Sequence, residues 1–341
     1  MTGERAGVAG PALSAAHAVQ CPAPLVSVVI AAYNSEATIG AAIASVREQT
    51  EQAIEIIVVD DCSQDGTVAE VLRSVAEDRR VTLVQLSRNQ GPGAARNAAI
   101  DVATAEWIAL LDADDTFQPH RLERLRKLGT QNDADMVSDD VLLCEDGQPV
   151  VTVLPPHLWP EPRQMDVLEF LSGNKGARGQ RRILYGFMKP MFRRNFLIRN
   201  GLRFPPLYFA EDYILYLKCL ISDARWLVVP EPMYNYRVRG NSLTANFTPE
   251  QLASVAAADG EVLNLPAVTA NSPLYRAIRQ HKLEVERAVS WMQFVFAVRR
   301  GDLRCAVSAA LSSRQALRHV TSQTLRAIPR TCARVATRGQ I

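Results

Sequence analysis

The segment WIALLDADDTF, residues 107–117, joins an apolar run to a cluster of acids. Its first part, Trp107 to Leu111, has the continuous hydrophobicity of a strand that is buried on both faces. Asp112, Asp114 and Asp115 follow directly, and carboxylates so close together resist ionising at the same time. A bound cation would offset this repulsion, and so would exposure to water.

Strand-like and helix-like patterns alternate around this segment. The strand-like runs are apolar throughout and lie at residues 26–32, 54–59, 81–86 and 107–111. Helical spacing follows the first three runs, near residues 39–46, 66–75 and 91–102. The alternation predicts an α/β fold, with a Rossmann-like, mostly parallel sheet and helices on both of its faces.

Polar residues collect at the carboxyl ends of these predicted strands. They are Tyr33 and Asn34, Asp60 and Asp61, Arg88 and Asn89, and the acids between Asp112 and Asp115. In open α/β sheets, ligands bind beyond the carboxyl ends of the strands. The four groups are therefore expected to share one rim of the sheet, which becomes the predicted ligand site.

The alternation weakens after residue 130. Strands are expected at residues 135–143, 226–229 and 233–238, with a short helix at 212–221. From about residue 249 the sequence turns helical and rich in alanine, which predicts a C-terminal helical extension. Residues 299–341 contain nine arginines and a single acid, Asp302. This Arg-rich segment would lie on a membrane surface, pack on the core, or pair with a partner helix.

Composition narrows the classes of function. A net charge of +2 argues against a general polyanion binder, and no recognition module for nucleic acid is present. The six cysteines have no paired spacing, which is typical of a reducing compartment. Residues 1–24 lack a signal-peptide pattern and are expected to be disordered, and no apolar run is long enough to cross a bilayer. A cytoplasmic protein is expected.

The segment RNQGPGAARN, residues 88–97, places two glycines before a helix start, where backbone N–H groups favour anions. The alternative is an ordinary tight loop. A dinucleotide fingerprint would follow the first strand, but AAYNSEAT stands there and contains no glycine. A nicotinamide oxidoreductase is therefore disfavoured.

Four motifs together resemble one family. VSVVIAAYN (26–34), VVDDCSQDGT (58–67), RNQGPGAARN (88–97) and LLDADD (110–115) match, in order and spacing, the nucleotide-binding half of family 2 glycosyltransferases with the GT-A fold. The resemblance covers residues 26–120 closely and 180–245 more loosely. It implies a nucleotide-sugar-binding half at 25–130 and an acceptor-side half at 131–248, followed by the helical extension at 249–341.

The resemblance also implies a donor site. Ala32 and Tyr33 would lie along the uracil and ribose of a UDP-sugar, and Asp60 would accept a hydrogen bond from the uracil. Arg96 and the loop at Gly93 would lie near the ribose and diphosphate. From the residues alone, Asp60 could instead be a helix-start acid and Arg96 a solvated helical charge.

Asp112 and Asp114 form the family's DxD pattern, which binds ribose and Mg²⁺ or Mn²⁺. They project to one side of an extended segment and suit a hard divalent cation. Asp115 is a further candidate ligand, and an exposed acidic turn is the alternative for all three. Arg239 stands where family members often have a metal- or diphosphate-binding His. Its guanidinium would grip a diphosphate but would not ligate a metal, unless it is only a solvated strand charge.

The segment YFAEDYILYL, residues 208–217, carries the acidic pair Glu211 and Asp212 before an apolar helical stretch. In the family such a pair is catalytic, and its Asp acts as general base on the acceptor hydroxyl. A single displacement would invert the anomeric centre. The alternative is a pair of first-turn acids that stabilise the helix.

Two further features bear on the acceptor. Processive family members carry Gln-x-x-Arg-Trp, but Ser222 precedes Arg225-Trp226 here, which predicts one sugar per encounter. Residues 173–201 resemble transferases of succinoglycan-type exopolysaccharide synthesis, which use lipid-diphosphate-linked oligosaccharides. The basic residues of this segment would meet a diphosphate or a membrane, or form a solvated loop: Lys175, Arg178, Arg181 and Arg182.

The resulting prediction is an inverting, non-processive glycosyltransferase. It would move a hexose, glucose, from UDP to a lipid-linked exopolysaccharide precursor at the inner face of a bacterial plasma membrane. One alternative is a sugar nucleotidyltransferase, which would want a Gly- and Lys-containing loop after the first strand. The other is a catalytically silent nucleotide-sugar-binding scaffold in a membrane assembly.

Overall fold

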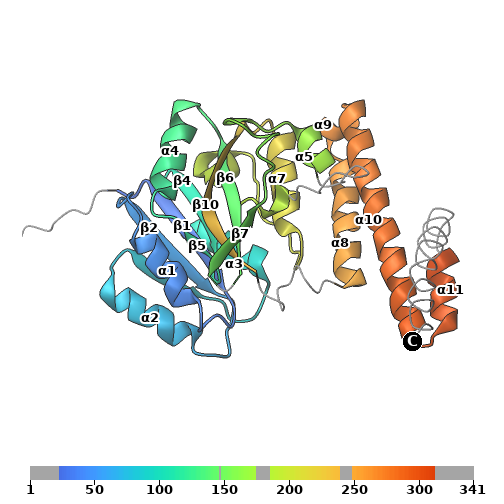
Figure 1. The fold of residues 1–341 in the computed structure, drawn as a ribbon, viewed down its shortest axis with the longest axis horizontal. Helices are drawn as coiled ribbons and strands as arrows, with labels where there is room; N and C mark the ends of the chain where they lie inside the picture. Colours follow the sequence, from blue (N-terminus) through green and yellow to red (C-terminus); the bar gives the residue numbers. More distant parts are fainter. Residues whose placement is uncertain (1–22, 146, 174–184, 239–247, 312–341) are drawn as a thin grey trace, which may run out of the picture.

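The computed structural model describes residues 23–145, 147–173, 185–238 and 248–311, and its centre is one ten-stranded sheet (Figure 1). Four parallel strands form the N-terminal part of this sheet, in the order β3-β2-β1-β4. They are β1 (Val26–Ala32), β2 (Ile54–Asp60), β3 (Val81–Gln85) and β4 (Trp107–Asp112). The predicted parallel sheet is confirmed.

The register of these strands determines which residues lie together at the carboxyl edge, or rim, of the sheet. Ala32 at the end of β1 lies beside Asp60 at the end of β2, and Ala31 lies beside Asp112 at the end of β4. The backbone N–H of Asp61 donates to the carbonyl of Ala32 over 2.8 Å, which ties the first two strand ends together. The polar residues that follow β1, β2 and β4 therefore lie along one edge of the sheet.

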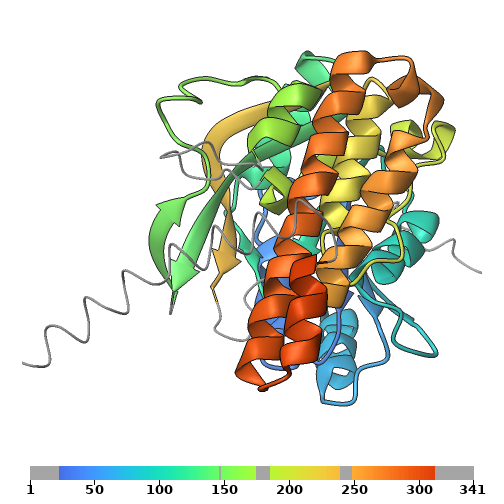
Figure 2. The same ribbon diagram turned by 90° about the vertical axis from the view of Figure 1, so that its right-hand side faces the viewer.

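Helices cover both faces of the sheet, as predicted (Figures 1 and 2). One core packs under α1 (Ile39–Arg47), α2 (Thr67–Glu77) and α4 (Arg121–Gln131). The opposite core packs under α3 (Pro92–Val102) and α7 (Glu211–Ile221), together with the C-terminal helices. Neighbouring residues of β1, such as Val28 and Val29, alternate between the two cores because successive strand side chains point to opposite faces.

The C-terminal part of the sheet continues from β4 through antiparallel β9 (Met191–Arg193) to β6 (Met136–Glu145), β10 (Trp226–Arg237) and β5 (Thr116–Phe117). Two short strands, β7 (Gln148–Thr152) and β8 (Arg163–Gln164), pair with β6 and β10. The sequence predicts two separate strands where the structure has the single strand β10. Register shifts at Pro232 interrupt its pairing without ending it, because proline cannot donate to the ladder.

The remaining helices lie on the α3–α7 side of the sheet or beyond it. They are α5 (Val167–Gly173), α6 (Arg194–Arg199), α8 (Pro249–Leu263), α9 (Pro266–Thr269), α10 (Ser272–Arg299) and α11 (Leu303–Leu311), with a 3-10 turn, η1, at Tyr185–Phe187. Thr248 and Gln251 form a capping box that starts α8 at the predicted position. Figure 2 shows α8 and α10 side by side, with α11 against the end of α10.

The C-terminal helices are anchored to α7. Asp259 on α8 is fully buried, and its carboxylate lies 2.7 Å from Nδ1 of His281 on α10. The hydroxyl of Tyr213 on α7 lies 3.1 Å from the same nitrogen. Within the described residues, no helix is both long and apolar enough to cross a membrane. The segment predicted to be disordered, residues 1–24, lies outside the described residues apart from residues 23 and 24.

Candidate active site

Hydrogen bonds hold together the loops that follow β1, β2 and β3 at the rim of the sheet. Asp61 is buried, and its carboxylate accepts hydrogen bonds from the backbone N–H groups of Gln90 and Gly91, each over 2.8 Å. Asp60 is also buried and accepts from the N–H of Ser63. Tyr33 remains exposed beside them. Asp60 lies six residues before the α2 N-cap, Gly66, so its carboxylate shapes the turn and does not cap the helix.

The start of α3 comes unusually close to the segment that leads into α7. A Cβ added at Gly93 would lie 2.9 Å from the carbonyl oxygen of Pro205 and 3.2 Å from Cβ of Phe204. Gly91 adopts φ +86°, a conformation that favours glycine. The glycines therefore have a local packing reason, and the approach brings Arg96 towards Glu211.

Arg96 joins the predicted donor-side and acceptor-side acids. Its guanidinium lies 2.7 Å from Oδ1 of Asp112, 2.6 Å from Oε1 of Glu211 and 3.0 Å from Oδ1 of Asp212. Arg96 is only 4% exposed, so the alternative of a solvated helical charge is wrong. The end of β4 and the start of α7, a hundred residues apart in sequence, meet at one guanidinium.

Glu211 and Asp212 occupy the first turn of α7, directly after Ala210 in the left-handed conformation. A non-glycine residue in that conformation stores about 1 kcal/mol of strain and is common at functional sites. Both acids are buried, and the apolar residues around the rest of α7 are also buried. The helix is thus fixed by packing, and its first turn presents the two carboxylates to Arg96.

Lys189 completes the cluster, although it is not among the site residues predicted from the sequence. Its Nζ lies 2.5 Å from Oδ2 of Asp212 and 3.1 Å from Oδ2 of Asp112. It stands in the apolar run FMKPMF, residues 187–192, where a lysine is rarely buried unless it is paired. That unusual placement is the one signal in the sequence that points to it.

Burial and charge act in opposite directions on this cluster. Burial alone would raise the pKa of Asp112, but the positive charges of Lys189 and Arg96 outweigh it and hold that pKa far below its ordinary range. Burial, followed by the negative charge of Asp212, raises the pKa of Glu211. Burial alone would lower the pKa of Lys189, but the negative charges of Asp112 and Asp212 outweigh it and raise that pKa. The ammonium therefore stays charged at neutral pH.

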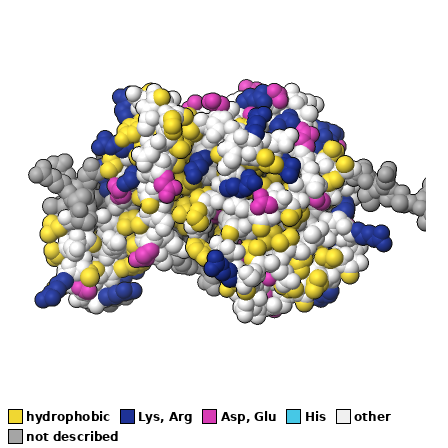
Figure 3. Space-filling model, turned by 180° about the vertical axis from the view of Figure 1, so that it is seen from behind, with side chains coloured by type: hydrophobic (Ala, Val, Ile, Leu, Met, Phe, Trp, Pro, Cys, Tyr) yellow, Lys and Arg dark blue, Asp and Glu magenta, His cyan; other side chains and the backbone are white. Residues whose placement is uncertain are grey.

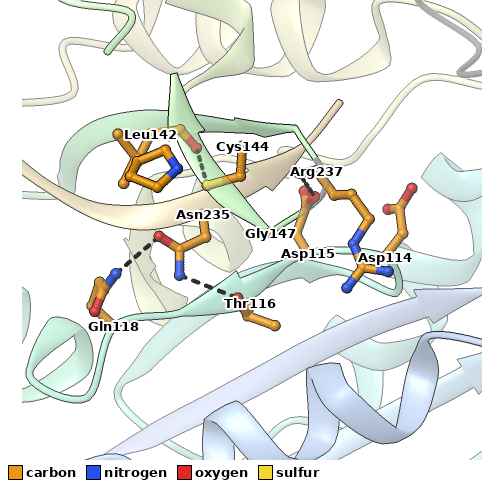
Figure 4. Close-up of a pocket in the computed structure, with 10 residues that line it drawn as sticks. Asp114, Asp115, Thr116, Gln118, Leu142, Cys144, Gly147, Asn235 and Arg237 are labelled. Atoms are coloured by element: carbon orange, nitrogen blue, oxygen red, sulfur yellow. Dashed lines mark hydrogen bonds between the residues drawn. The ribbon is translucent and has the colours of Figure 1, made fainter. Parts of the chain in front are cut away.

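The three acids after β4 have different surroundings. Asp115 is buried and accepts hydrogen bonds from the Tyr234 hydroxyl and the Arg237 backbone N–H, both over 2.8 Å. Burial and the charges of Asp112 and Asp114 raise the pKa of Asp115. Asp114 is half-buried at one end of a pocket of about 200 Å³ (Figure 4). Figure 4 shows Gln118 at the opposite end from Asp114, with Asn235 and Thr116 between them.

The carboxylates of Asp112, Asp114 and Asp115 suit a divalent metal ion that completes its coordination shell with water and substrate oxygens. In the described part of the chain, no three His, Cys, Asp or Glu side chains converge as a preformed metal centre. Both oxygens of Asp112 contact cations, and both oxygens of Asp115 accept hydrogen bonds. Asp114 is half-buried and lines the pocket, so it is a candidate ligand for a cation such as Mg²⁺, which needs only one or two protein ligands.

Some predicted site residues lie outside the described residues. These are Arg239 and the four basic residues Lys175, Arg178, Arg181 and Arg182, together with the chain beyond residue 311. Ion pairs join four of the predicted residues, which are Arg96, Asp112, Glu211 and Asp212.

Comparison with known proteins identifies the family. The family model described as glycosyl transferase family 2 matches residues 27–196. The succinoglycan biosynthesis protein ExoO of Rhizobium meliloti is 35% identical to this chain over 91% of the chain and 88% of its own length. The chain belongs to glycosyl transferase family 2. A second relative, the succinoglycan biosynthesis protein ExoU of the same organism, is 34% identical over 76% of this chain and 75% of its own length.

Solved structures show the GT-A fold of this family 2 glycosyltransferase. S. aureus TarS in complex with UDP-GlcNAc superposes with a TM-score of 0.59 at 20% identity, over 85% of this chain and 91% of TarS. The mannosyltransferase PcManGT of Pyrobaculum calidifontis, in complex with GDP-Man and Mn²⁺, superposes with a TM-score of 0.56 at 20% identity, over 90% of this chain and 81% of that one. The predicted fold and the predicted enzyme class are confirmed.

Proposed function

We propose that this enzyme is an inverting, non-processive transferase that moves a hexose, glucose, from UDP to a lipid-linked precursor of an exopolysaccharide. The observation that carries the proposal is the contact of Asp112 and Asp212 with the same two cations, Arg96 and Lys189. A donor-side acid and a candidate base thereby lie within one cluster. The succinoglycan names of the two relatives support the choice of an exopolysaccharide.

The donor would lie along the rim of the sheet. Ala32, Tyr33 and Asp60 stand at the ends of β1 and β2, where the uracil and ribose would be held. Gly93 and Arg96 stand at the start of α3, whose N-terminus favours the negative charge of a diphosphate. Binding of UDP-GlcNAc by TarS supports a UDP-sugar donor here.

Asp212 would act as the general base. A hydroxyl oxygen of the acceptor attacks the anomeric carbon while its proton passes to the Asp212 carboxylate, and the bond from that carbon to UDP breaks with both electrons leaving on UDP. A single displacement of this kind inverts the anomeric centre. Glu211 shares Arg96 with Asp212 and would hold the guanidinium in place.

Asp114, with Asp112 beside it, would hold Mg²⁺ or Mn²⁺. When bound, the metal neutralises charge that develops on the departing diphosphate. The Mn²⁺ in the PcManGT complex supports a divalent ion in this fold. Asp115 would shape the turn through Tyr234 and Arg237, and Arg239 would grip the diphosphate from the segment after β10.

The C-terminal arm, which consists of residues 299–311 with helix α11, would hold the enzyme at the inner face of the plasma membrane. Leu303, Val307 and Leu311 recur one turn apart along α11 and are 72%, 55% and 61% exposed. Arg300 and Arg304 are exposed beside them, and Figure 3 shows apolar and basic side chains interspersed at the lower left, over this arm. Such a mixture suits an anionic lipid surface, where the lipid-linked acceptor resides.

A screen of nucleotide sugars tests the function directly. The enzyme is incubated with each sugar nucleotide and an extract of lipid-linked oligosaccharides, and release of the nucleoside diphosphate is measured. We expect acceptor-dependent release of UDP from UDP-glucose, with a β-linked product from the α-linked donor. Binding of UDP-glucose without turnover would instead indicate a silent scaffold, and release of inorganic pyrophosphate from UTP and a sugar phosphate would indicate a nucleotidyltransferase.

A further inference from the structure

Lys189 is placed between the two halves of the site. It lies in the connection between η1 and β9, and its side chain is only 7% exposed. Its ammonium contacts Oδ2 of Asp212 on one side and Oδ2 of Asp112 on the other. A lysine so deeply buried is stable only with charged partners, and here both partners belong to the proposed reaction site.

The four side chains form a closed ring of alternating charge. Arg96 contacts Oδ1 of both Asp112 and Asp212, while Lys189 contacts Oδ2 of both. Each aspartate is therefore held through both of its oxygens, by one cation at each. Two attachment points fix the plane of a carboxylate, whereas one would leave it free to rotate about its Cβ–Cγ bond.

The backbone that carries Lys189 is itself fixed. Its carbonyl oxygen accepts a hydrogen bond from Nη2 of Arg121 over 2.6 Å. Arg121 is fully buried and forms an ion pair with Asp139 over 2.8 Å. Pro190 follows and restricts Lys189 to an extended backbone conformation. The ammonium is therefore presented from a rigid base and not from a loose loop.

We propose that Lys189 is the positioning residue for Asp212: it orients the Asp212 carboxylate towards the acceptor hydroxyl and fixes its place relative to Asp112. This inference rests on the proposed role of Asp212 as base. Arg96 alone divides its guanidinium among three carboxylates and sets only one oxygen of Asp212. Lys189 sets the other oxygen, so that the base and the donor-side acid keep one geometry.

A positioning role makes a prediction that a purely structural role does not. A base displaced by about 1 Å loses on the order of 100-fold in rate, although the substrate still binds. If Lys189 acts through Asp212, removing its charge costs activity only while Asp212 is present. If Lys189 merely stabilises the fold, the same factor is lost whether or not Asp212 is present.

The experiment is a double-mutant cycle on the full-length enzyme. Transfer from radiolabelled UDP-glucose to the lipid-linked extract is measured for Lys189→Met, Asp212→Asn and the double variant, and UDP affinity is measured by calorimetry. Lys127→Met is the control, because Lys127 is an exposed lysine paired with Glu123 on the surface. We expect Lys189→Met to lower kcat about 100-fold with UDP affinity within about threefold of wild type. In the Asp212→Asn background it should lower kcat by less than about threefold.

Two results would overturn the proposal: a wild-type kcat in Lys189→Met, or an equal loss in both backgrounds. If Lys189→Met does not fold, the same cycle with Lys189→Arg decides, because the charge stays while the contact to Asp212 changes. A loss of kcat in Lys189→Arg that disappears in the Asp212→Asn background would support the role, and an equal loss in both backgrounds would refute it. Full activity of Asp212→Asn alone would refute the proposed base, whereas full activity of Lys189→Met beside an inactive Asp212→Asn would refute only the positioning role.

Discussion

Replacing Arg96 tests whether the two halves of the site meet as described. Arg96→Gln keeps a polar side chain but removes the charge that faces Asp112, Glu211 and Asp212 at 2.6–3.0 Å. Removal of one partner of a buried ion pair lowers the free energy of unfolding by about 3–5 kcal/mol, because the opposite charge stays buried without compensation. Lys189 still faces Asp112 and Asp212, so the loss should lie within this range and not at a multiple of it.

The expected change in melting temperature follows from the size of the chain. Unfolding entropy is about 2.1 cal/mol/K per residue, or roughly 0.7 kcal/mol/K for 341 residues. A loss of about 3–5 kcal/mol therefore lowers the melting temperature by about 4–7 °C. Differential scanning calorimetry resolves a change of this size.

The control is Arg124→Gln. Arg124 forms an ion pair with Glu231 in which both side chains are 46% exposed, and exposed pairs contribute about 0.2–1 kcal/mol. Its melting temperature should fall by less than about 1.5 °C. The double variant Arg96→Gln, Glu211→Gln should recover part of the loss, because one uncompensated carboxylate is gone. Equal melting temperatures for Arg96→Gln and Arg124→Gln would refute the charge cluster.

Three further predictions concern the metal, the membrane and pH. Treatment with EDTA should abolish transfer, and Mn²⁺ or Mg²⁺ should restore it; activity that is indifferent to EDTA would instead assign charge neutralisation to Arg239. The double variant Leu303→Ser, Val307→Ser should weaken sedimentation with phosphatidylglycerol vesicles at least tenfold, because burial of each apolar side chain in the lipid contributes about 1.5–3 kcal/mol. The control Val150→Ser, on the exposed strand β7, should sediment like wild type. Equal sedimentation of the double variant and the control would refute membrane contact by α11. Burial raises the pKa of Asp140 from 3.8 to about 6, so its contribution to stability is complete below pH 4 and is lost as the pH rises through 6. Between pH 4 and pH 7, the free energy of unfolding of wild type should therefore fall by up to about 3 kcal/mol relative to that of Asp140→Asn, as measured by denaturant titration. Unfolding free energies of the two proteins that change in parallel with pH would contradict the raised pKa of Asp140.

Local patterns were enough to predict the framework of the fold. The apolar run of β4 and the alternation before it correctly indicated a parallel sheet, and the strand ends indicated one rim. The early part of the sheet was predictable because each strand is continuous and apolar. The single strand β10 was not, since Pro230 and Pro232 interrupt the pattern that defines a strand although the chain stays extended.

Contacts across long sequence separations could not be predicted from local pattern. Arg96 and Glu211 are 115 positions apart, and nothing near Arg96 indicates that it is buried. Asp115 looks like another exposed acid in sequence, but Tyr234 and Arg237, more than a hundred positions later, enclose it. Lys189 carried only the weak signal of a lysine in an apolar run, because its partners come from two distant elements.

The central claim is that Asp212 removes the proton from the acceptor hydroxyl, and one variant tests it most directly. Asp212→Asn keeps the size of the side chain and removes its basicity, so transfer to the lipid-linked acceptor should fall by at least about 1000-fold while the affinity for UDP stays within a few-fold of wild type. Glu250→Gln, an exposed acid of α8, serves as the control and should transfer at the wild-type rate. Wild-type transfer by Asp212→Asn would contradict the claim.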